Sequence, residues 1–374
     1  MSNSKEVIII GGSYAAILAL KTLFLAGTPN LKITIISPNE KAFFNVAAPR
    51  LLVDNDYSDK TLVPLKDTIE KLSRQSSSRN RQVRHVKSRV ESLDLDGKQL
   101  TISSGQVLDY DYLIVASGSR SSSSLWKLDN LHDYDYIINK IDKTREKIKQ
   151  AESIAIIGGG STGVETAGEI GNAYKGEKKR IVLYTGSSGP LSNSLPKHLS
   201  DTATNKLKQL GVEVVNNQRV STNDGKEIIF EDGTQKSEKF DLVIEAQKLT
   251  PNTEFMPKSE LDENQWVVTD EYFRLINHHN VICLGDVLAL GIHSIVDLTY
   301  NQKPVFTKVI ANEILEQGHI ELQAYRAPTK MTMIVPIGKS GGVGVLFGWS
   351  LPNFVIWFVK ARDFMINKAR DYFS

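Results

Sequence analysis

The stretch Val-Ile-Ile-Ile-Gly-Gly-Ser-Tyr-Ala-Ala at residues 7–16 decides the fold of this chain. Its four β-branched residues predict a strand that is buried on both faces, as in a parallel sheet. The glycines predict a tight turn, and the apolar residues 17–23 predict a helix after it. A second apolar run at 31–36 ends at Ser37-Pro38 and completes a strand–helix–strand unit of about 30 residues.

The same order of elements returns at residues 154–184, where the turn Gly-Gly-Gly-Ser-Thr-Gly at 158–163 lies between an apolar strand and a helix. In such a turn the first glycine permits the sharp bend, the second lets the backbone approach a pyrophosphate, and the third lets the helix pack on the strand. The second unit has glycine at all three positions, whereas the first has Gly11 followed by Ser13 and Ala16. We therefore predict an α/β chain with two Rossmann-like dinucleotide-binding domains.

A carboxylate that would bind the ribose hydroxyls is expected at the end of the second strand of each unit. Ser37 occupies this position in the first unit and Thr185 in the second, and Glu40 can reach the first site from the loop. The lack of an acid in the second unit leaves room for a 2′-phosphate, with the basic run at 178–180 near it in sequence. The choice between NADH and NADPH therefore stays open.

Composition excludes several other classes of protein. The 374 residues are enough for two to three domains, and 45 basic against 43 acidic residues give a net charge of +2, so we expect no nucleic-acid partner. A single cysteine, Cys283, excludes an internal disulfide, a dithiol redox pair and a multi-cysteine metal centre, and we expect no metal. The first residues show no signal-peptide pattern, and Ser2 stands where N-myristoylation requires glycine, so we expect a cytoplasmic location.

Two further segments indicate which nucleotide each unit holds. Residues 109–118 resemble the apolar strand and Ala-Thr-Gly segment of flavoproteins with two dinucleotide domains, with Ser117 in place of threonine. Residues 280–286 resemble the second FAD motif of the same proteins, in which the aspartate, here Asp286, binds the ribitol hydroxyls. Together with the two glycine turns, these segments predict an FAD-containing NAD(P)H oxidoreductase.

A narrower resemblance rests on two motifs. Residues 45–50, Asn-Val-Ala-Ala-Pro-Arg, nearly copy the signature N-V-A-A-x-R, and residues 360–364 are similar to K-S-R-D-L. Over almost its whole length the chain resembles the AIF-homologous mitochondrion-associated inducers of death, known also as ferroptosis-suppressor quinone reductases. The resemblance implies non-covalent FAD, reduction by NADH or NADPH, and a quinone-type acceptor.

The candidate site residues follow from these motifs and from the resemblance. For FAD they are Gly11, Gly12, Ser13, Tyr14, Ala15, Ala16, Ser37, Arg50, Val90, Ala116, Ser117, Gly118, Gly285 and Asp286. For NAD(P)H they are Gly158, Gly159, Gly160, Ser161, Thr162, Gly163 and Glu165. Flavin itself does the redox chemistry, so the catalytic candidates are limited to Glu165, near the nicotinamide, and Lys360. A helix beginning near Ile295 is expected to aim its N-terminus at the flavin.

The predicted domains are an FAD domain in two parts with an NAD(P)H domain inserted in it. The boundaries are 1–122 and 270–325 for the FAD domain, 123–269 for the NAD(P)H domain, and 326–374 for a C-terminal segment of strands and an amphipathic helix.

The C-terminal segment leaves alternatives open. Residues 340–359 hold no charge, but their glycines and Pro352 argue against a lipid-exposed spanning helix. A helix from Phe354 would place one apolar face along its length, with Phe354, Trp357, Phe358, Ala361, Met365 and Tyr372 on that face. This helix would close the flavin pocket and line a quinone channel, lie on an anionic bilayer through residues 351–374, or only pack on the core. The second interpretation predicts peripheral attachment, on the mitochondrial outer membrane or on lipid droplets.

Two other functions remain open at this stage. One is an AIF-like flavoprotein of cell-death signalling that associates with nucleic acid, and the other is a ferredoxin or monodehydroascorbate reductase of the same architecture. The acceptor, the preferred nicotinamide nucleotide and the oligomeric state are not fixed by the sequence.

Overall fold

The computed structural model describes residues 4–74, 79–128, 134–233, 236–318 and 320–373. Its first domain is built on a parallel sheet of five strands in the order β19-β9-β1-β2-β5. The strands are β1 (Lys5–Ile10), β2 (Leu31–Ser37), β5 (Arg81–Lys87), β9 (Tyr112–Val115) and β19 (Val281–Cys283). Because β19 comes from late in the chain, the N-terminal and late segments form one domain, as predicted.

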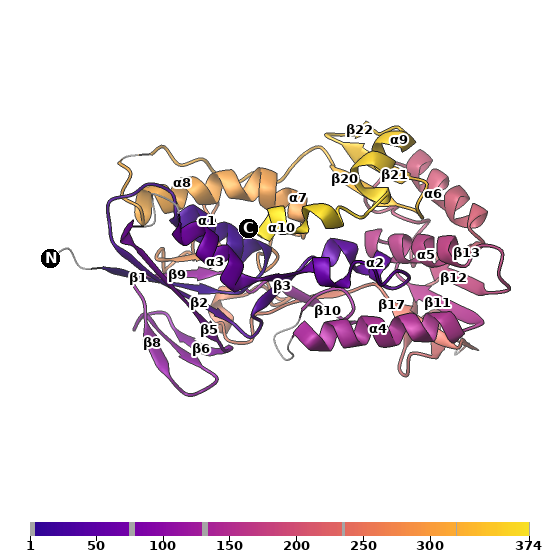
Figure 1. The fold of residues 1–374 in the computed structure, drawn as a ribbon, viewed down its shortest axis with the longest axis horizontal. Coiled ribbons are helices and arrows are strands. Elements are labelled where there is room, and N and C mark those ends of the chain that lie inside the picture. Colours follow the sequence, from indigo (N-terminus) through magenta and orange to yellow (C-terminus); the bar gives the residue numbers. More distant parts are fainter. Residues whose placement is uncertain (1–3, 75–78, 129–133, 234–235, 319, 374) are drawn as a thin grey trace.

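The second domain has a parallel sheet of four strands in the order β13-β12-β11-β17, all from the middle of the chain. The strands are β11 (Ser153–Ile157), β12 (Arg180–Tyr184), β13 (Val212–Val215) and β17 (Leu242–Glu245). Figure 1 shows this sheet in the right half of the molecule and the first sheet in the left half. The prediction of two Rossmann-like domains, one inserted in the other, is confirmed.

Helices cover both sheets, and small antiparallel sheets are attached to them. The helices that follow the glycine turns are α1 (Tyr14–Leu23) and α5 (Ser161–Ala173). Other helices are α2 (Ala48–Leu51), α3 (Leu65–Ser73), α4 (Tyr134–Gln150), α6 (Lys197–Gln209), α7 (Ile295–Asp297) and α8 (Lys303–Glu313). Short 3-10 helices are η1 (Asn45–Ala47), η2 (Ser58–Thr61) and η4 (Lys258–Glu260), and η5 (Leu298–Gln302) is a π-helix that joins α7 to α8. The additional strands are β3 (Lys41–Phe43), β4 (Leu62–Pro64), β6 (Val90–Asp94), β7 (Gln99–Ile102), β8 (Val107–Asp109), β14 (Val220–Thr222), β15 (Glu227–Phe230) and β16 (Ser237–Lys239).

The two connections between the domains pair with each other. Strand β10 (Ser119–Ser121) leaves the first domain and β18 (Leu249–Pro251) returns to it, and the two are antiparallel neighbours. Trp126, just beyond β10, is buried and donates a hydrogen bond of 2.7 Å from its indole Nε1 to the carbonyl oxygen of Glu245. The crossing is therefore a hydrogen-bonded structure, and the predicted boundary at 122 falls beside it.

The C-terminal segment packs against both domains. It comprises β20 (Met333–Pro336), β21 (Gly342–Leu346), β22 (Trp349–Ser350), α9 (Asn353–Ile356), η6 (Trp357–Ala361), η7 (Ile366–Lys368) and α10 (Ala369–Phe373). In Figure 1 the strands and α9 lie beside α5 and α6, whereas α10 lies over the first domain. The final ring, Phe373, packs against Tyr14 with 4.6 Å between ring centroids, which places the end of the chain next to the first glycine turn.

The prediction of one continuous amphipathic helix from Phe354 to Tyr372 is wrong. The helical run that begins at Asn353 ends at Ala361, since Phe364 and Met365 adopt left-handed backbone angles, with φ of 52° and 59°. This turn buries Phe364 completely among apolar side chains of the first domain, and that burial outweighs continued helical pairing. Ala361 is buried while Phe354 and Phe358 are exposed, so the expected single face does not exist. Within the described part of the chain no helix is both long enough and apolar enough to cross a membrane.

Candidate active site

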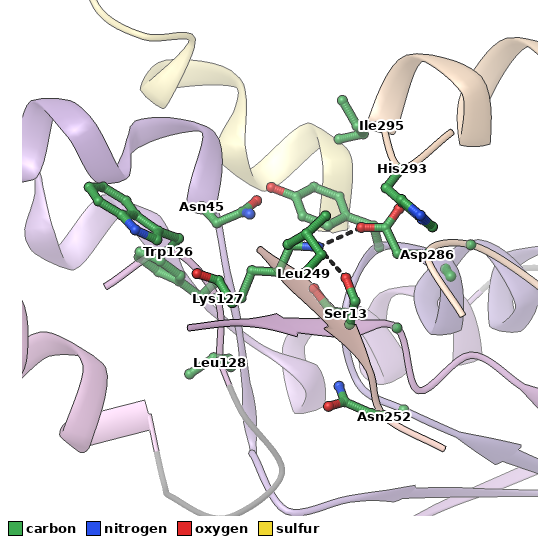
Figure 2. A pocket seen from close by; sticks show the side chains of 18 of the residues that line it. Ser13, Asn45, Trp126, Lys127, Leu128, Leu249, Asn252, Asp286, His293 and Ile295 are labelled. Atoms are coloured by element: carbon green, nitrogen blue, oxygen red, sulfur yellow. Dashed lines mark hydrogen bonds and ion pairs between the residues drawn. The ribbon is translucent and has the colours of Figure 1, made fainter. Parts of the chain in front are cut away.

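A cavity of about 610 Å³ lies where the two domains and the C-terminal segment meet. Its wall includes the first glycine turn, the end of β9, residues 285–286, the second glycine turn, the end of β17, and part of β20. Figure 2 shows the side chains of Ser13, Lys127, Asp286 and His293 converging on this space from different elements. The carboxyl ends of the central strands of both sheets thus open into one site, as is usual for ligand sites in such folds.

The first glycine turn fits a bound dinucleotide. Gly11 has φ of 128°, and a Cβ placed on it would lie 2.2 Å from the carbonyl oxygen of Ala116. A Cβ on Gly12 would lie 2.5 Å from the hydroxyl oxygen of Ser37, so both positions require glycine. Ser13 precedes α1 without forming a side-chain cap to a described residue, and the first turn of α1 holds no acid. The amides at this helix N-terminus are therefore directed at a place suited to phosphate.

The substituted position Ser117 has a structural role beside the cavity. Its hydroxyl donates to the carbonyl oxygen of Asn252 at 2.7 Å, and the Asn252 amide donates back to the carbonyl oxygen of Ser117 at 2.9 Å. Arg120 donates to the side-chain oxygen of Asn252 at 2.9 Å. Serine in place of threonine therefore joins the end of β9 to the returning connection.

The predicted second FAD motif is also held from two sides. The Gly285 amide donates to Gln302 Oε1 at 2.9 Å, and a Cβ on Gly285 would lie 2.7 Å from the Cβ of Ala15. Asp286 forms an ion pair of 2.5 Å with Lys127 Nζ (Figure 2). Lys127 Nζ also donates to the hydroxyl of Ser119 at 2.7 Å. Asp286 therefore lies within reach of both the first glycine turn and the interdomain connection.

Glu165 and Lys360 meet at the opposite wall of the cavity, although 195 residues separate them in sequence. Lys360 Nζ lies 2.6 Å from Glu165 Oε1 and 3.3 Å from the carbonyl oxygen of Ile334. Burial raises the pKa of the Glu165 carboxyl above its ordinary value, and the charge and hydrogen bond of Lys360 offset part of this rise. The pair is a buried, proton-holding group that faces the site.

The second glycine turn divides into packing residues and cavity residues. A Cβ on Gly158 would lie 2.7 Å from the carbonyl oxygen of Ala246, one on Gly159 would lie 2.8 Å from Thr185, and one on Gly163 would lie 1.9 Å from the carbonyl oxygen of Gly158. Gly160 has no atom of another described residue within 4 Å of such a Cβ and lines the cavity with Ser161 and Thr162. The three packing glycines position this turn, and the other three residues are the ones that a ligand could touch.

Arg50 is placed differently from its prediction as an FAD contact. Its side chain is buried outside the cavity lining and forms an ion pair with Glu169 of α5. It also donates to the carbonyl oxygens of Ala361, at 2.9 Å, and Arg362, at 3.3 Å. Arg50 therefore joins α2, α5 and the C-terminal segment. Its neighbour Pro49 lines the cavity in its place.

Most of the remaining predicted residues line the cavity, and one does not. Ala16 is buried in α1 and does not line the cavity. The predicted FAD residues that do line it are Gly11, Gly12, Ser13, Tyr14, Ala15, Ser37, Val90, Ala116, Ser117, Gly118, Gly285 and Asp286. The helical run after Gly285-Asp286 begins at Ile295 as predicted, and Ile295 and Val296 border the site.

The basic run at 178–180 is too far from the glycine turn to bind a 2′-phosphate. It precedes β12, whereas Thr185 follows β12 next to the glycine turn, so the two lie at opposite ends of the strand. Lys179 Nζ donates to the carbonyl oxygen of Ile148 at 3.0 Å, and Arg180 pairs with Glu238 at 2.5 Å. In the first domain Glu40 pairs with Lys87 at 3.3 Å and lies outside the cavity lining.

Lys127 and His293 are among the cavity residues that sequence reasoning missed. Lys127 belongs to a serine-rich connection without any motif, and only its distant partner Asp286 gives it a place in the site. His293 stacks on Trp266 with 4.1 Å between ring centroids and lines the cavity, and burial lowers the pKa of its imidazole. No local pattern in the sequence distinguishes either residue.

Cys283 takes no part in the site. It lies in β19 with no exposed surface, and burial raises the pKa of its thiol. Among the residues that the structure describes, no group of three or more His, Cys, Asp or Glu side chains could hold a metal ion.

Comparison with known proteins agrees with this architecture. The oxidoreductase ptaL of Pestalotiopsis fici is 30% identical over 382 residues, which cover 97% of each chain. Ferroptosis suppressor protein 1 of Homo sapiens is 23% identical, with 98% of this chain and 95% of its own covered. This full-length similarity confirms the resemblance inferred from the motif at 45–50.

The fold is shared with solved structures as well. The sulfide:quinone oxidoreductase of Aquifex aeolicus superposes with a TM-score of 0.77 over 99% of this chain and 92% of its own, at 17% identity. Residues 5–306 match the family described as pyridine nucleotide-disulphide oxidoreductase, so the chain belongs to that family.

Proposed function

We propose that this protein passes electrons from NAD(P)H through FAD to a quinone-type acceptor. Membership of the family makes the chain an oxidoreductase with FAD and a nicotinamide dinucleotide as its cofactors. The observation that carries the proposal is the single cavity that both glycine turns and the Glu165–Lys360 pair line. One site can thus bring two nucleotides and an acceptor together.

The described residues fit both nucleotides. The amides at the N-terminus of α1 would hold the pyrophosphate of FAD, and Asp286 would accept hydrogen bonds from its ribitol hydroxyls. The amides at the N-terminus of α5, next to Gly160, would hold the pyrophosphate of NAD(P)H. FAD, when bound, accepts a hydride and releases electrons to the acceptor.

The chain's own residues supply orientation and protons. The hydrogen bonds of Ser117 with Asn252, and of Gly285 with Gln302, hold the walls against which a flavin would lie. Lys360 Nζ holds a transferable proton at the cavity surface, and Glu165 Oε1 is positioned to replace it. Reduction of a quinone to a quinol consumes two protons, so a buried donor pair is chemically suited to this acceptor.

The cysteine content supports an acceptor that takes electrons directly from the flavin. Cys283 is the only cysteine of the chain and is buried, so no cysteine pair can relay electrons as a disulfide would. Met333, Ile334 and Leu249 give the cavity an apolar border suited to a quinone ring. The sulfide:quinone oxidoreductase of Aquifex aeolicus, which shares the fold of this chain, is by its name an enzyme that uses a quinone.

The test is flavin reduction followed by an acceptor panel. Purified protein loaded with FAD is mixed with excess NADH or NADPH without oxygen, and the flavin absorbance should bleach. A water-soluble short-chain quinone should then restore the absorbance faster than ferredoxin or monodehydroascorbate does. Flavin that stays oxidised with both nucleotides would contradict the oxidoreductase assignment, whereas bleaching without reoxidation by quinone would contradict only the acceptor.

A further inference from the structure

Exposed aromatic side chains gather on one part of the C-terminal segment. Of the fourteen large apolar side chains that are exposed among the described residues, seven lie between residues 331 and 358. We call these seven the aromatic patch: Met331, Leu346, Phe347, Trp349, Phe354, Trp357 and Phe358. The exposed fraction is 78% for Trp349, 71% for Phe354 and 60% for Phe358. Such a concentration marks an interaction site more often than chance exposure.

The patch is presented by a rigid frame. Asn353 Oδ1 accepts hydrogen bonds from the Gly342 amide at 3.0 Å and from Lys206 Nζ at 2.8 Å, and its amide donates to the carbonyl oxygen of Ser340 at 2.9 Å. These bonds join α9 to the hairpin of β21 and β22 and to α6. The apolar tips on the hairpin and on α9 are therefore held as one surface.

The hairpin tip carries backbone strain. Phe347 has φ of 48°, a left-handed angle that is unfavourable for a bulky side chain, and its amide donates to Thr332 Oγ1 at 3.0 Å. Its ring is nevertheless 57% exposed, so burial within the chain does not compensate for this conformation. Strain of this kind persists only where the surrounding structure imposes it, here the tight turn between β21 and β22, and it clusters at functional sites.

Two cations, Arg362 and Lys330, lie next to the patch, and the segment that carries the patch is basic. Residues 326–374 contain seven Lys and Arg against two Asp, so this segment is strongly basic although the whole chain carries only +2. The Arg362 guanidinium lies over the Phe358 ring at 4.7 Å, and the Lys330 side chain passes beside Gly348 at the hairpin tip. Cations that surround exposed tryptophan and phenylalanine are typical of surfaces that insert between anionic headgroups.

We propose that the aromatic patch docks on an anionic lipid bilayer. A second copy of the chain is a poorer occupant, because a symmetric contact would bring two basic surfaces together. The docking surface differs from the one predicted at residues 351–374, because Ala361, Phe364 and Phe373 are buried and the hairpin of β21 and β22 takes their place. The attachment is peripheral and reversible.

Docking on lipid would also bring the active site close to the membrane. Strand β20 begins two residues after Met331 and lines the cavity with Met333 and Ile334, and η6 carries both Trp357 of the patch and Lys360 of the site. This part of the inference rests on the proposed function: a lipophilic quinone would enter the cavity from the bilayer past β20.

The test is co-sedimentation of the FAD-loaded protein with vesicles. Vesicles of phosphatidylcholine with 30% phosphatidylserine should bind the protein, and binding should weaken with added salt and on pure phosphatidylcholine. The triple variant Trp349→Ser, Phe354→Ser and Phe358→Ser should lower the partition coefficient at least ten-fold. A matched control, Ile276→Ser with Val107→Ser, removes exposed apolar side chains away from the patch and should bind as the wild type does.

Three outcomes would overturn the inference. They are a wild-type protein that stays in the supernatant with anionic vesicles, a triple variant that binds as well as the wild type, and a patch-dependent dimer that forms in place of vesicle binding. The triple variant should keep its rate with a soluble quinone, since none of its three residues lines the cavity. Failure of flavin reduction in the wild type would count against the proposed function and leave the vesicle result unaffected.

Discussion

Replacing Arg50 by methionine should destabilise the protein strongly, although Arg50 touches no cavity. The change leaves the Glu169 carboxylate buried without its cation and removes the donors of the Ala361 and Arg362 carbonyl oxygens. Removing one partner of a buried ion pair costs about 3–5 kcal/mol, much more than the surface value of about 0–1 kcal/mol. The three elements that Arg50 joins should loosen together.

The expected loss in the free energy of unfolding corresponds to a shift in the melting temperature. At about 2.1 cal/mol/K for each residue, unfolding 374 residues has an entropy of about 0.8 kcal/mol/K, so the loss corresponds to about 4–6 °C. The double variant Arg50→Met with Glu169→Met should recover most of this loss, because it leaves no unpaired charge. Burial raises the pKa of Glu169, so the penalty in the single variant should also shrink as the pH is lowered and the carboxyl takes up a proton.

Thermal unfolding at fixed FAD concentration measures these differences. Arg74→Met serves as the control, because Arg74 is exposed and pairs with Glu70 only at 3.7 Å, and it should shift the melting temperature by less than about 1 °C. The reasoning is refuted if Arg50→Met melts within 1 °C of the wild type, or if the double variant is no more stable than the single one.

Three further predictions concern the site. Glu165→Gln should make the free energy of unfolding depend less on pH. The raised pKa of Glu165 makes the folded state bind the proton more tightly than the unfolded state, so the stability of the wild type falls as the pH rises from 4.5 through that pKa. Denaturant titrations should show a smaller fall in the variant. Gly163→Ala should unfold more easily than the wild type, whereas Gly160→Ala should keep its stability and raise the KM for NAD(P)H, as melting and steady-state assays can show. Asp286→Ala should release at least ten-fold more FAD on desalting, and unchanged flavin content would count against its assignment.

The glycine turns could be predicted because their information is local. Each rests on a β-branched strand, a positive-φ glycine and a helix, all within about 20 residues of sequence. The same holds for Gly285-Asp286, where the strand and the motif are adjacent. These segments fixed both the class of fold and most of the cavity lining.

What could not be predicted depends on pairs of residues far apart in the chain. Lys127 meets Asp286 across 159 residues and Arg50 meets Glu169 across 119, and neither pair leaves a periodic pattern in the sequence. In the C-terminal segment a local pattern is present but misleading. Its periodicity predicts a continuous helix, whereas burial of Phe364 in the first domain imposes a left-handed turn. Tertiary burial overrides local propensity in this segment.

The two carboxylates of α5 explain why the C-terminal segment lies where it does. Glu165 and Glu169 are one helical turn apart and therefore share one face of the helix that begins at the second glycine turn. Glu165 pairs with Lys360, and Glu169 binds Arg50, which in turn holds the carbonyl oxygens of residues 361 and 362. The N-terminus of α5, where we place NAD(P)H, the Glu165–Lys360 pair in the cavity and the segment that carries the aromatic patch are thus connected through a single helix. A change that breaks either pair should alter acceptor use as well as stability, because the same hydrogen bonds and ion pairs position the cavity wall and the C-terminal segment.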